Sequence, residues 1–245
     1  MNQFLIRLVC CFVPKRELRH FLRRCRFGRY KVKGKNNKII FAGHKLPKFL
    51  KIAGLKININ GNNNSVIIGN HVKTSKSSVD IGNDNADIKI CDGVQLYNIF
   101  IRCAFGDSQS VIIGENSVMY GGYITCDECR GAIIGKNCLF AANLRMRSSD
   151  GHSILSKDTN NILNMPKKDI EIGDHVWLGA NVAILKNASI PNNTIVGIGS
   201  IVTKQFDTEN TIIAGNPAQI IKTGVDWSPI NPYAFEKKQR GKSND

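Results

Sequence analysis

The sequence predicts an all-β fold, a solenoid whose chain coils as a parallel β-helix of hexapeptide repeats. Within residues 172–202 an aliphatic side chain occupies every sixth position: Ile172, Leu178, Ile184, Ile190, Val196 and Val202. Four places after each of the first five comes a small or β-branched residue: Val176, Val182, Ala188, Thr194 and Ser200. A period of six fits neither a helix nor the two-residue alternation of an isolated strand. It fits a triangular coil of three short strands, in which each hexad forms one side and points its aliphatic residue inward.

The first part of the chain is expected to form a basic amphipathic helical arm over residues 1–30. Two short helical patterns, residues 4–13 and 15–25, flank Pro14, which cannot continue a helix. Residues 1–56 hold sixteen lysines and arginines against one acid, Glu17, and so carry the whole net charge of +15. Such an arm either lies on an anionic membrane surface or packs on the solenoid or on a neighbouring subunit, and the sequence leaves both alternatives open.

The distribution of charge and apolar residues also argues against several classes of protein. The rest of the 245-residue chain is electrically neutral and carries no recognised nucleic-acid-binding module, so we expect no nucleic-acid partner. The apolar stretch at residues 4–13 is interrupted by Arg7 and is shorter than the roughly 18 residues of a membrane span. No small-residue cleavage site follows it. We therefore expect a cytoplasmic protein, with the arm as a candidate peripheral contact to the inner face of the cell membrane.

The solenoid is expected to span residues 31–222, with one large interruption. Ile113 and Ile134, each followed by glycine, are 21 residues apart, which is one coil of 18 plus three. Ile134 and Ile172 are 38 residues apart, which is one coil plus twenty. This excess predicts a loop extruded from the coil at about residues 147–168.

The end of the repeat and its corners carry further structural signals. Pro217 cannot donate to a sheet ladder and marks the end of coiling, and residues 223–245 are interpreted as a C-terminal extension. Asparagines gather where corners are expected, as at residues 62–64, because asparagine tolerates left-handed backbone angles. Metal binding is not expected. Cys126 and Cys129 form a lone CxxC with no second pair, which is weak support for zinc.

Four segments resemble the hexapeptide-repeat acyltransferase family: IGDHVWLG at residues 172–179, ILK at 184–186, IPNNTIVGIGSIVTK at 190–204 and AGNPA at 214–218. The resemblance implies a left-handed β-helix, a homotrimer and acetyl-CoA as co-substrate. Within the family, the segment RMRSSDGH at residues 145–152 is similar to that of bacterial O-acetyltransferases that modify capsule, O-antigen or polysialic acid.

The long loop holds the candidate general base. Transfer of an acetyl group to a sugar hydroxyl needs a group that removes the hydroxyl proton, and histidine suits this because its unperturbed pKa of about 6.5 lies near working pH. His152 lies in the loop, and the resemblance places the catalytic histidine of the family there. His71 and His175 fall at regular corners, where a solvated or stacked imidazole is expected. Asp150 either orients the His152 imidazole, binds a sugar hydroxyl or forms an Asx turn.

Trp177 is the second candidate catalytic residue. It replaces the small residue usual at its place in the hexad, so its ring faces outward and must be covered by another group. A sugar ring or the pantetheine arm of acetyl-CoA would cover it, and packing against the His152 loop is the structural alternative.

The candidate residues for the acetyl donor lie near the end of the solenoid. Gly179, Gly197 and Gly199 let a ligand approach the backbone closely, and their N–H groups are candidates to hold the oxyanion of a tetrahedral intermediate. Lys204 and Lys222 are candidate partners for the phosphates of CoA.

The candidate acceptor-binding residues are Arg145, Arg147 and Asp150, at the start of the loop. The two arginines would bind the carboxylate of a sialic or uronic acid. These residues predict acetyl-CoA-dependent O-acetylation of a sugar hydroxyl in a bacterial surface polysaccharide, by direct transfer with His152 as base. The alternatives are a small acceptor, such as a nucleotide-linked amino sugar or an antibiotic, and a non-catalytic adaptor at the membrane.

Overall fold

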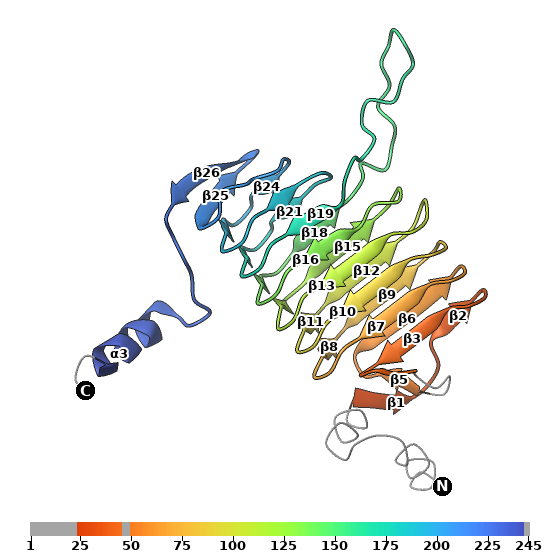
Figure 1. Ribbon diagram of the computed structural model, residues 1–245, viewed down its shortest axis with the longest axis horizontal. Coiled ribbons are helices and arrows are strands. Elements are labelled where there is room, and N and C mark those ends of the chain that lie inside the picture. The colour runs from red at the N-terminus through yellow and green to blue at the C-terminus, as the bar shows by residue number, and fades with distance from the viewer. Residues whose placement is uncertain (1–23, 46–49, 243–245) are drawn as a thin grey trace, which may run out of the picture.

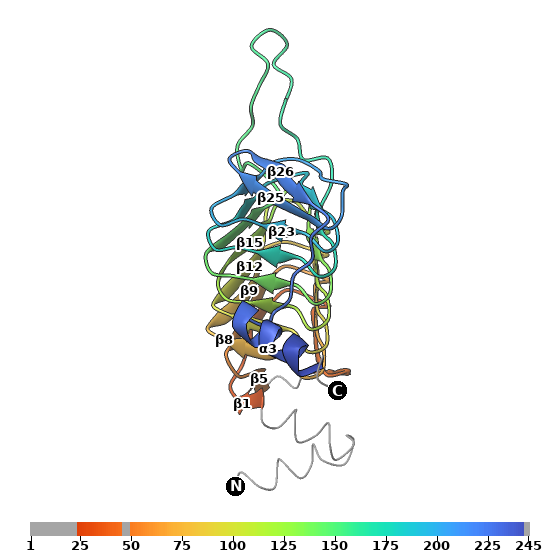
Figure 2. The same cartoon turned by 90° about the vertical axis from the view of Figure 1, so that its left-hand side faces the viewer.

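The computed structural model of the chain describes residues 24–45 and 50–242. The chain coils into a triangular β-solenoid, with a long loop projecting from its side and a helix beside it (Figure 1, Figure 2). Three sheets form the sides of the prism, and successive coils add one strand to each, so that parallel pairing runs along the solenoid. The all-β solenoid predicted from the hexads is therefore confirmed.

The three sheets are named here I, II and III. Sheet I contains β2 (Lys31–Lys33), β6 (Leu55–Asn60), β9 (Ser77–Ile81), β12 (Ile99–Cys103), β15 (Gly122–Cys126), β18 (Leu144–Arg147), β21 (Ala183–Ile184) and β24 (Ile201–Val202). Sheet II contains β4 (His44–Lys45), β3 (Lys38–Phe41), β7 (Ser65–Ile68), β10 (Asp87–Ile90), β13 (Ser110–Ile113), β16 (Ala132–Ile134), β19 (Ile170–Ile172) and β22 (Ser189–Ile190). Sheet III contains β8 (Lys73–Ser75), β11 (Gln95–Tyr97), β14 (Val118–Met119), β17 (Leu139–Phe140), β20 (Trp177–Leu178), β23 (Ile195–Val196), β25 (Thr211–Gly215) and β26 (Ala218–Thr223).

The inward rows of side chains set the register between coils. Every aliphatic residue of the six-residue series is buried, as is each small or β-branched residue four places later. Ile113 pairs with Ile134, and Ile134 pairs with Ile172, although the second pair is much further apart in sequence. The additional residues are therefore held outside the coil, and the core continues past them.

Asparagines at the corners have the structural role expected of them. Asn63 and Asn85 adopt positive φ angles of 57° and 59°, a region that asparagine tolerates better than most residues. The side-chain amide of Asn63 donates to Oδ1 of Asn85 in the next coil at 3.2 Å. His71 and His175 occupy corner positions of the same kind, with φ of 57° and 55°.

The first coil is closed by a short antiparallel pair, and this corrects one boundary. Cys25–Phe27 forms strand β1, which pairs with β5 (Leu50–Ile52), so the arm expected to be helical over residues 1–30 is extended at that point. Cys25 is buried there and helps to cover the end of the core. Residues 1–23, with the helical pattern at residues 4–13 and most of that at 15–25, lie outside the described residues.

The other end of the solenoid is closed by a hairpin. Strands β25 and β26 pair antiparallel, with Pro217 in the turn between them, so parallel coiling stops where the sequence predicts. Strand β26 ends at Thr223, and the C-terminal extension then turns back along the solenoid to helix α3 (Pro232–Lys242), as Figure 2 shows. Within the described residues, no helix combines the length and the apolar character needed to cross a membrane.

Each inward residue of the solenoid should matter to stability, because it packs against its counterparts in the neighbouring coils. Replacing Ile101, which is 1% exposed, by alanine should lower the free energy of unfolding by about 2–5 kcal/mol, through lost burial and the cavity left behind. The matched Ile221→Ala change in β26, where the side chain is 64% exposed, should alter it by less than about 0.5 kcal/mol. Urea unfolding measures both, and equal losses would contradict the inward assignment.

Candidate active site

The long loop leaves sheet I after β18 and returns to sheet II at β19, so it spans residues 148–169. The interval predicted from the spacing, residues 147–168, differs from this by one residue. The loop is a hairpin whose two legs pair with each other: Leu163 N–H donates to Ile154 O, and Ser156 N–H donates to Asn161 O, both at 2.8 Å. Figure 1 shows it as a projection well clear of the sheets.

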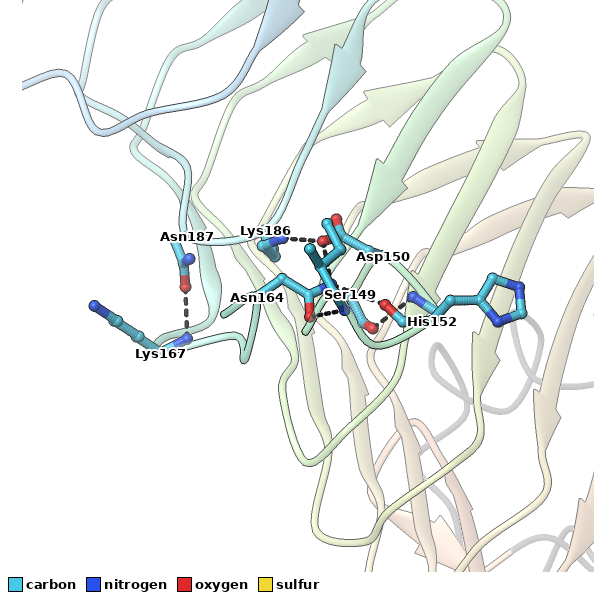
Figure 3. A network of polar contacts seen from close by, with 9 residues as sticks. Ser149, Asp150, His152, Asn164, Lys167, Lys186 and Asn187 are labelled. Carbon is cyan, nitrogen blue, oxygen red and sulfur yellow. Dashed lines mark hydrogen bonds and ion pairs between the residues drawn. The ribbon is translucent and has the colours of Figure 1, made fainter. Parts of the chain in front are cut away.

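Two consecutive residues of the following coil anchor the base of this loop (Figure 3). On the outgoing leg, the ammonium of Lys186 donates to the carboxylate of Asp150 as an ion pair. On the returning leg, Asn187 Oδ1 accepts hydrogen bonds from the backbone N–H groups of Lys167 and Lys168, at 2.7 and 3.1 Å. Both ends of the loop are therefore fixed to one corner of the solenoid, and the regular hexapeptide repeat sets the position of that corner.

Asn164 ties the two legs together next to the candidate base. Its Oδ1 accepts from Ile154 N–H at 2.8 Å, and its Nδ2 donates to Asp150 Oδ2 and to His152 O, also at 2.8 Å each. The backbone of His152 is thereby held from across the loop. Sequence reasoning missed Asn164, Lys186 and Asn187, since these polar residues lie outside residues 145–152 and make their contacts with the loop only when it folds back.

The imidazole of His152 is exposed and points away from this network, as Figure 3 shows. No hydrogen bond or ion pair of its ring is found among the described residues, whereas its carbonyl is fixed by Asn164. Asp150 contacts Lys186 and Asn164 instead of the His152 ring, so an orienting role for this carboxylate is not observed. The Lys186 hydrogen bond, followed by that of Asn164, lowers the pKa of Asp150 below its ordinary value.

The two candidate acceptor-binding arginines, Arg145 and Arg147, lie at the base of the loop. Arg147 ends β18, and a Cβ placed on Gly151 would lie only 3.2 Å from its Nη2 atom. Arg145 points outward from sheet I, with its guanidinium carbon 4.5 Å from the ring centroid of Tyr123. Arg147, Asp150 and His152 thus lie at the start of the loop, and Arg145 lies on the outward face of sheet I beside it.

Trp177 lies elsewhere in the same chain. It begins β20 in sheet III, whereas the loop joins sheet I to sheet II. Its ring is 39% exposed, and the nearby aromatic group is Trp227 of the C-terminal extension, with ring centroids 5.9 Å apart. Within one chain, the C-terminal extension approaches Trp177, and no ring contact, hydrogen bond or ion pair links it to the His152 loop among the described residues.

Trp227 was not among the residues singled out from the sequence. Its indole N–H donates to His175 O at 2.7 Å, and its ring stacks on the His175 imidazole at a centroid distance of 4.4 Å. The stacked corner imidazole expected for His175 is therefore observed. The available signal was a tryptophan inside an otherwise polar extension, because a large aromatic side chain in such a segment needs a surface to pack on.

The three candidate glycines have packing and hydrogen-bonding roles within the coil. A Cβ on Gly179 would lie 2.7 Å from Ile198 N, and one on Gly197 would lie 2.9 Å from Ala214 Cβ, so both sites lack space for a side chain. At Gly199 the space is open and φ is +71°. All three N–H groups donate to backbone carbonyls of neighbouring coils at 2.8–2.9 Å. The expectation that these N–H groups hold an oxyanion is corrected on that ground.

The two candidate lysines lie on the last coil and the terminal hairpin. Lys204 is exposed and donates to Gln219 Oε1 at 2.9 Å, while Lys222 lies exposed in β26 opposite Ile212. Of the lone CxxC pair, Cys126 is buried and Cys129 is exposed beside Asp107. Among the described residues, no group of three or more histidine, cysteine or acidic side chains is arranged to hold a metal ion.

Comparison with known proteins identifies the family to which this architecture belongs. No family model matches the chain. The polysialic acid O-acetyltransferase of Neisseria meningitidis is 36% identical over 198 residues, which cover 81% of this chain and 88% of the relative. The crystal structure of the polysialic acid O-acetyltransferase OatWY matches with a TM-score of 0.75 and 32% identity, over 87% of this chain and 99% of that one. The polySia-specific acetyltransferase NeuO matches with a TM-score of 0.73 and 28% identity, over 86% and 97%. The chain belongs to the hexapeptide-repeat O-acetyltransferases, in the family of the polysialic acid O-acetyltransferases.

Proposed function

We propose that this enzyme transfers an acetyl group from acetyl-CoA to a sugar hydroxyl of a bacterial surface polysaccharide that contains sialic acid. Relatives named polysialic acid O-acetyltransferases support this acceptor class. The observation that carries the proposal is the His152 imidazole, which is exposed and has no bonded partner among the described residues, on a loop whose base is anchored by Lys186 and Asn187. A histidine held this way has a free ring nitrogen for a substrate proton.

The transfer would proceed in two steps without a covalent enzyme intermediate. His152 removes the proton of the attacking hydroxyl as its oxygen bonds to the thioester carbonyl carbon, which forms a tetrahedral oxyanion and an imidazolium. The carbon–sulfur bond then breaks, the sulfur leaves as thiolate, and the imidazolium returns the proton to it. The products are an O-acetyl ester and CoA. Trp177 is a candidate donor to the oxyanion, since no partner for its indole N–H is found within the described part of the chain.

The two substrates would occupy different parts of the solenoid surface. We assign the acceptor carboxylate to Arg145 and Arg147, whose side chains are exposed on sheet I beside the loop. The donor would bind near the last coil, where Gly199 leaves open space and Lys204 and Lys222 are exposed to meet its phosphates.

A homotrimer would bring His152 and Trp177 together. Within one chain the loop lies at the corner between sheets I and II, whereas Trp177 lies on sheet III, so a complete site needs the loop of one subunit beside sheet III of the next. The loop also carries apolar side chains that are about half exposed or more: Ile154, Leu155, Ile162, Leu163 and Met165. A neighbouring copy would cover them, and closed cyclic symmetry would repeat the contact. The basic arm at residues 1–30 remains our candidate for peripheral membrane contact, although residues 1–23 lie outside the described residues.

Removing the base should abolish most of the turnover. His152→Asn should lower kcat by about 10²–10⁴-fold, because proton removal then falls to water. Release of CoA thiol in the presence of sialic acid oligomers measures this, while calorimetry with acetyl-CoA and circular dichroism should be unchanged. His71→Asn is the matched control, because asparagine accepts the positive φ of that corner. Near-normal turnover of His152→Asn would refute the assignment.

Lys186 should act as a positioning residue for the loop. In Lys186→Met the Asp150 anchor is lost, and we expect kcat to fall by about 10–100-fold because the base is displaced. The pKa of the Asp150 carboxyl, followed by NMR, should rise toward its ordinary value, since the hydrogen bond from Lys186 is the largest cause of its lowering. Lys186→Arg should restore both properties. Lys157→Met near the loop tip is the control, and equal effects of the two methionine variants would contradict this role.

Substitutions on the apolar surface of the loop test whether this surface forms the contact between subunits of a trimer. Leu163 is 65% exposed in the single chain, and Leu163→Asp should shift the protein from trimer to monomer in light scattering while reducing turnover. Leu163→Met, which keeps the apolar contact, should remain trimeric and active. A trimeric Leu163→Asp variant would show that this surface is not the subunit contact.

A further inference from the structure

The C-terminal extension forms one wall of a cavity next to Trp177. The cavity has a volume of about 740 Å³, within the usual range for small-molecule sites. Sheet III contributes Leu139, Trp177 and Ile195, which are the outward residues of three successive strands in register. The opposite wall comes from residues 226–239, including Trp227 and Phe235. Both walls are thus largely apolar and aromatic.

The second tryptophan is held rigidly at this cavity. The Trp227 ring is stacked on His175, its indole N–H donates to His175 O at 2.7 Å, and its backbone N–H donates to Asp226 Oδ1, also at 2.7 Å. Asp226 Oδ1 lies 3.5 Å from Nδ1 of His175 as well. These contacts fix Trp227 with its ring tilted by 42° to that of Trp177. Two large rings at an angle form a cleft with an aromatic surface on each side.

The charges around the cavity indicate which part of a substrate fits. Its lining includes two carboxylates, Asp226 and Glu236, but no lysine or arginine. Glu236 pairs with Arg240, one turn further along α3. Phosphate groups of the donor would meet no cation of the lining, and the candidate lysines Lys204 and Lys222 lie outside it. A neutral sugar face suits the cavity, because its C–H groups pack on aromatic rings while its hydroxyls donate to carboxylates.

We propose that Trp227, presented by the C-terminal extension, forms with Trp177 an acceptor subsite that holds the uncharged face of a sugar ring. This rests on the proposed function, since it makes the acceptor a saccharide. The ring in this cavity would direct its carboxylate outward, away from Asp226 and Glu236. The C-terminal extension therefore contributes to acceptor binding, and Trp227 is a further specificity-determining residue.

The chain offers a direct optical test, because it contains two tryptophans and both line this cavity. In the absence of donor, adding sialic acid oligomers should change the tryptophan emission of the wild-type protein. The variant Trp177→Phe isolates the emission of Trp227, which should still respond to the oligomer and should change little with acetyl-CoA. A response of Trp227 to acetyl-CoA and none to the saccharide would overturn the proposal and assign the cavity to the donor.

Steady-state kinetics give the second measurement. Trp227→Ala should raise the acceptor KM by about 3–10-fold, the range expected for loss of one aromatic contact, with the KM for acetyl-CoA unchanged. Tyr233→Ala is the control, since that side chain is 78% exposed on the same segment and does not line the cavity. If the alanine variant fails to fold, Trp227→Phe, which keeps a ring but loses the bond to His175, should give a smaller rise.

The outcomes separate this inference from the proposed function. Saccharide-dependent emission from Trp227 without any acetyl transfer would support the subsite and refute the function. Acetyl transfer with an unchanged acceptor KM in Trp227→Ala would refute the subsite and keep the function. A change of subunit number in light scattering for Trp227→Ala, with no emission response to saccharide, would show that the cavity is filled by a neighbouring copy, and this too would refute the subsite.

Discussion

The parallel register between successive coils holds both the core and the long loop of this protein in place. Each inward aliphatic residue pairs in parallel with its counterpart one coil away, as Leu178 does with Phe140 and Val196, and together these residues form the core. A slip of one residue would turn every inward side chain outward, which would expose the whole core. The corners absorb differences in coil length, so the register survives even the 38-residue step from Ile134 to Ile172.

The same register gives the long loop its fixed position. Its two legs are bound by Lys186 and Asn187, which are adjacent on one corner of the next coil. Asn164 then transmits that anchoring across the hairpin to the carbonyl of His152. The projecting loop is thereby attached to the regular part of the solenoid. The His152 ring, near the base of the loop, remains exposed and points away from the anchoring residues. Residues placed by rigid elements hold catalytic geometry better than residues on free loops.

Much of the fold and part of the site could be predicted from local pattern. The six-residue period identifies the buried rows, and counting against it locates the loop that contains His152. The predictions that failed concern long-range contacts. The N–H groups of Gly179 and its two counterparts are used by neighbouring coils, and β1 pairs with β5 where a helix was expected. Of the three roles left open for Asp150, orientation of the His152 ring is not observed, because the carboxylate pairs with Lys186. Local sequence does not show which backbone groups a distant segment will occupy.

The solenoid, the inward and outward assignment of its residues and the place of its interruption follow from the amino-acid sequence, because a repeat read along the chain specifies each of them. Which residues from distant segments meet was established by the folded structure alone. It placed Asn164 against His152, Trp227 against His175 and Trp177, and the loop between sheets I and II, away from Trp177 on sheet III. Such contacts join segments separated by up to 52 residues, and they depend on how the coils stack and how the extension folds back. The repeat predicts the stacked coils, but it does not show where the loop and the extension fold back onto them.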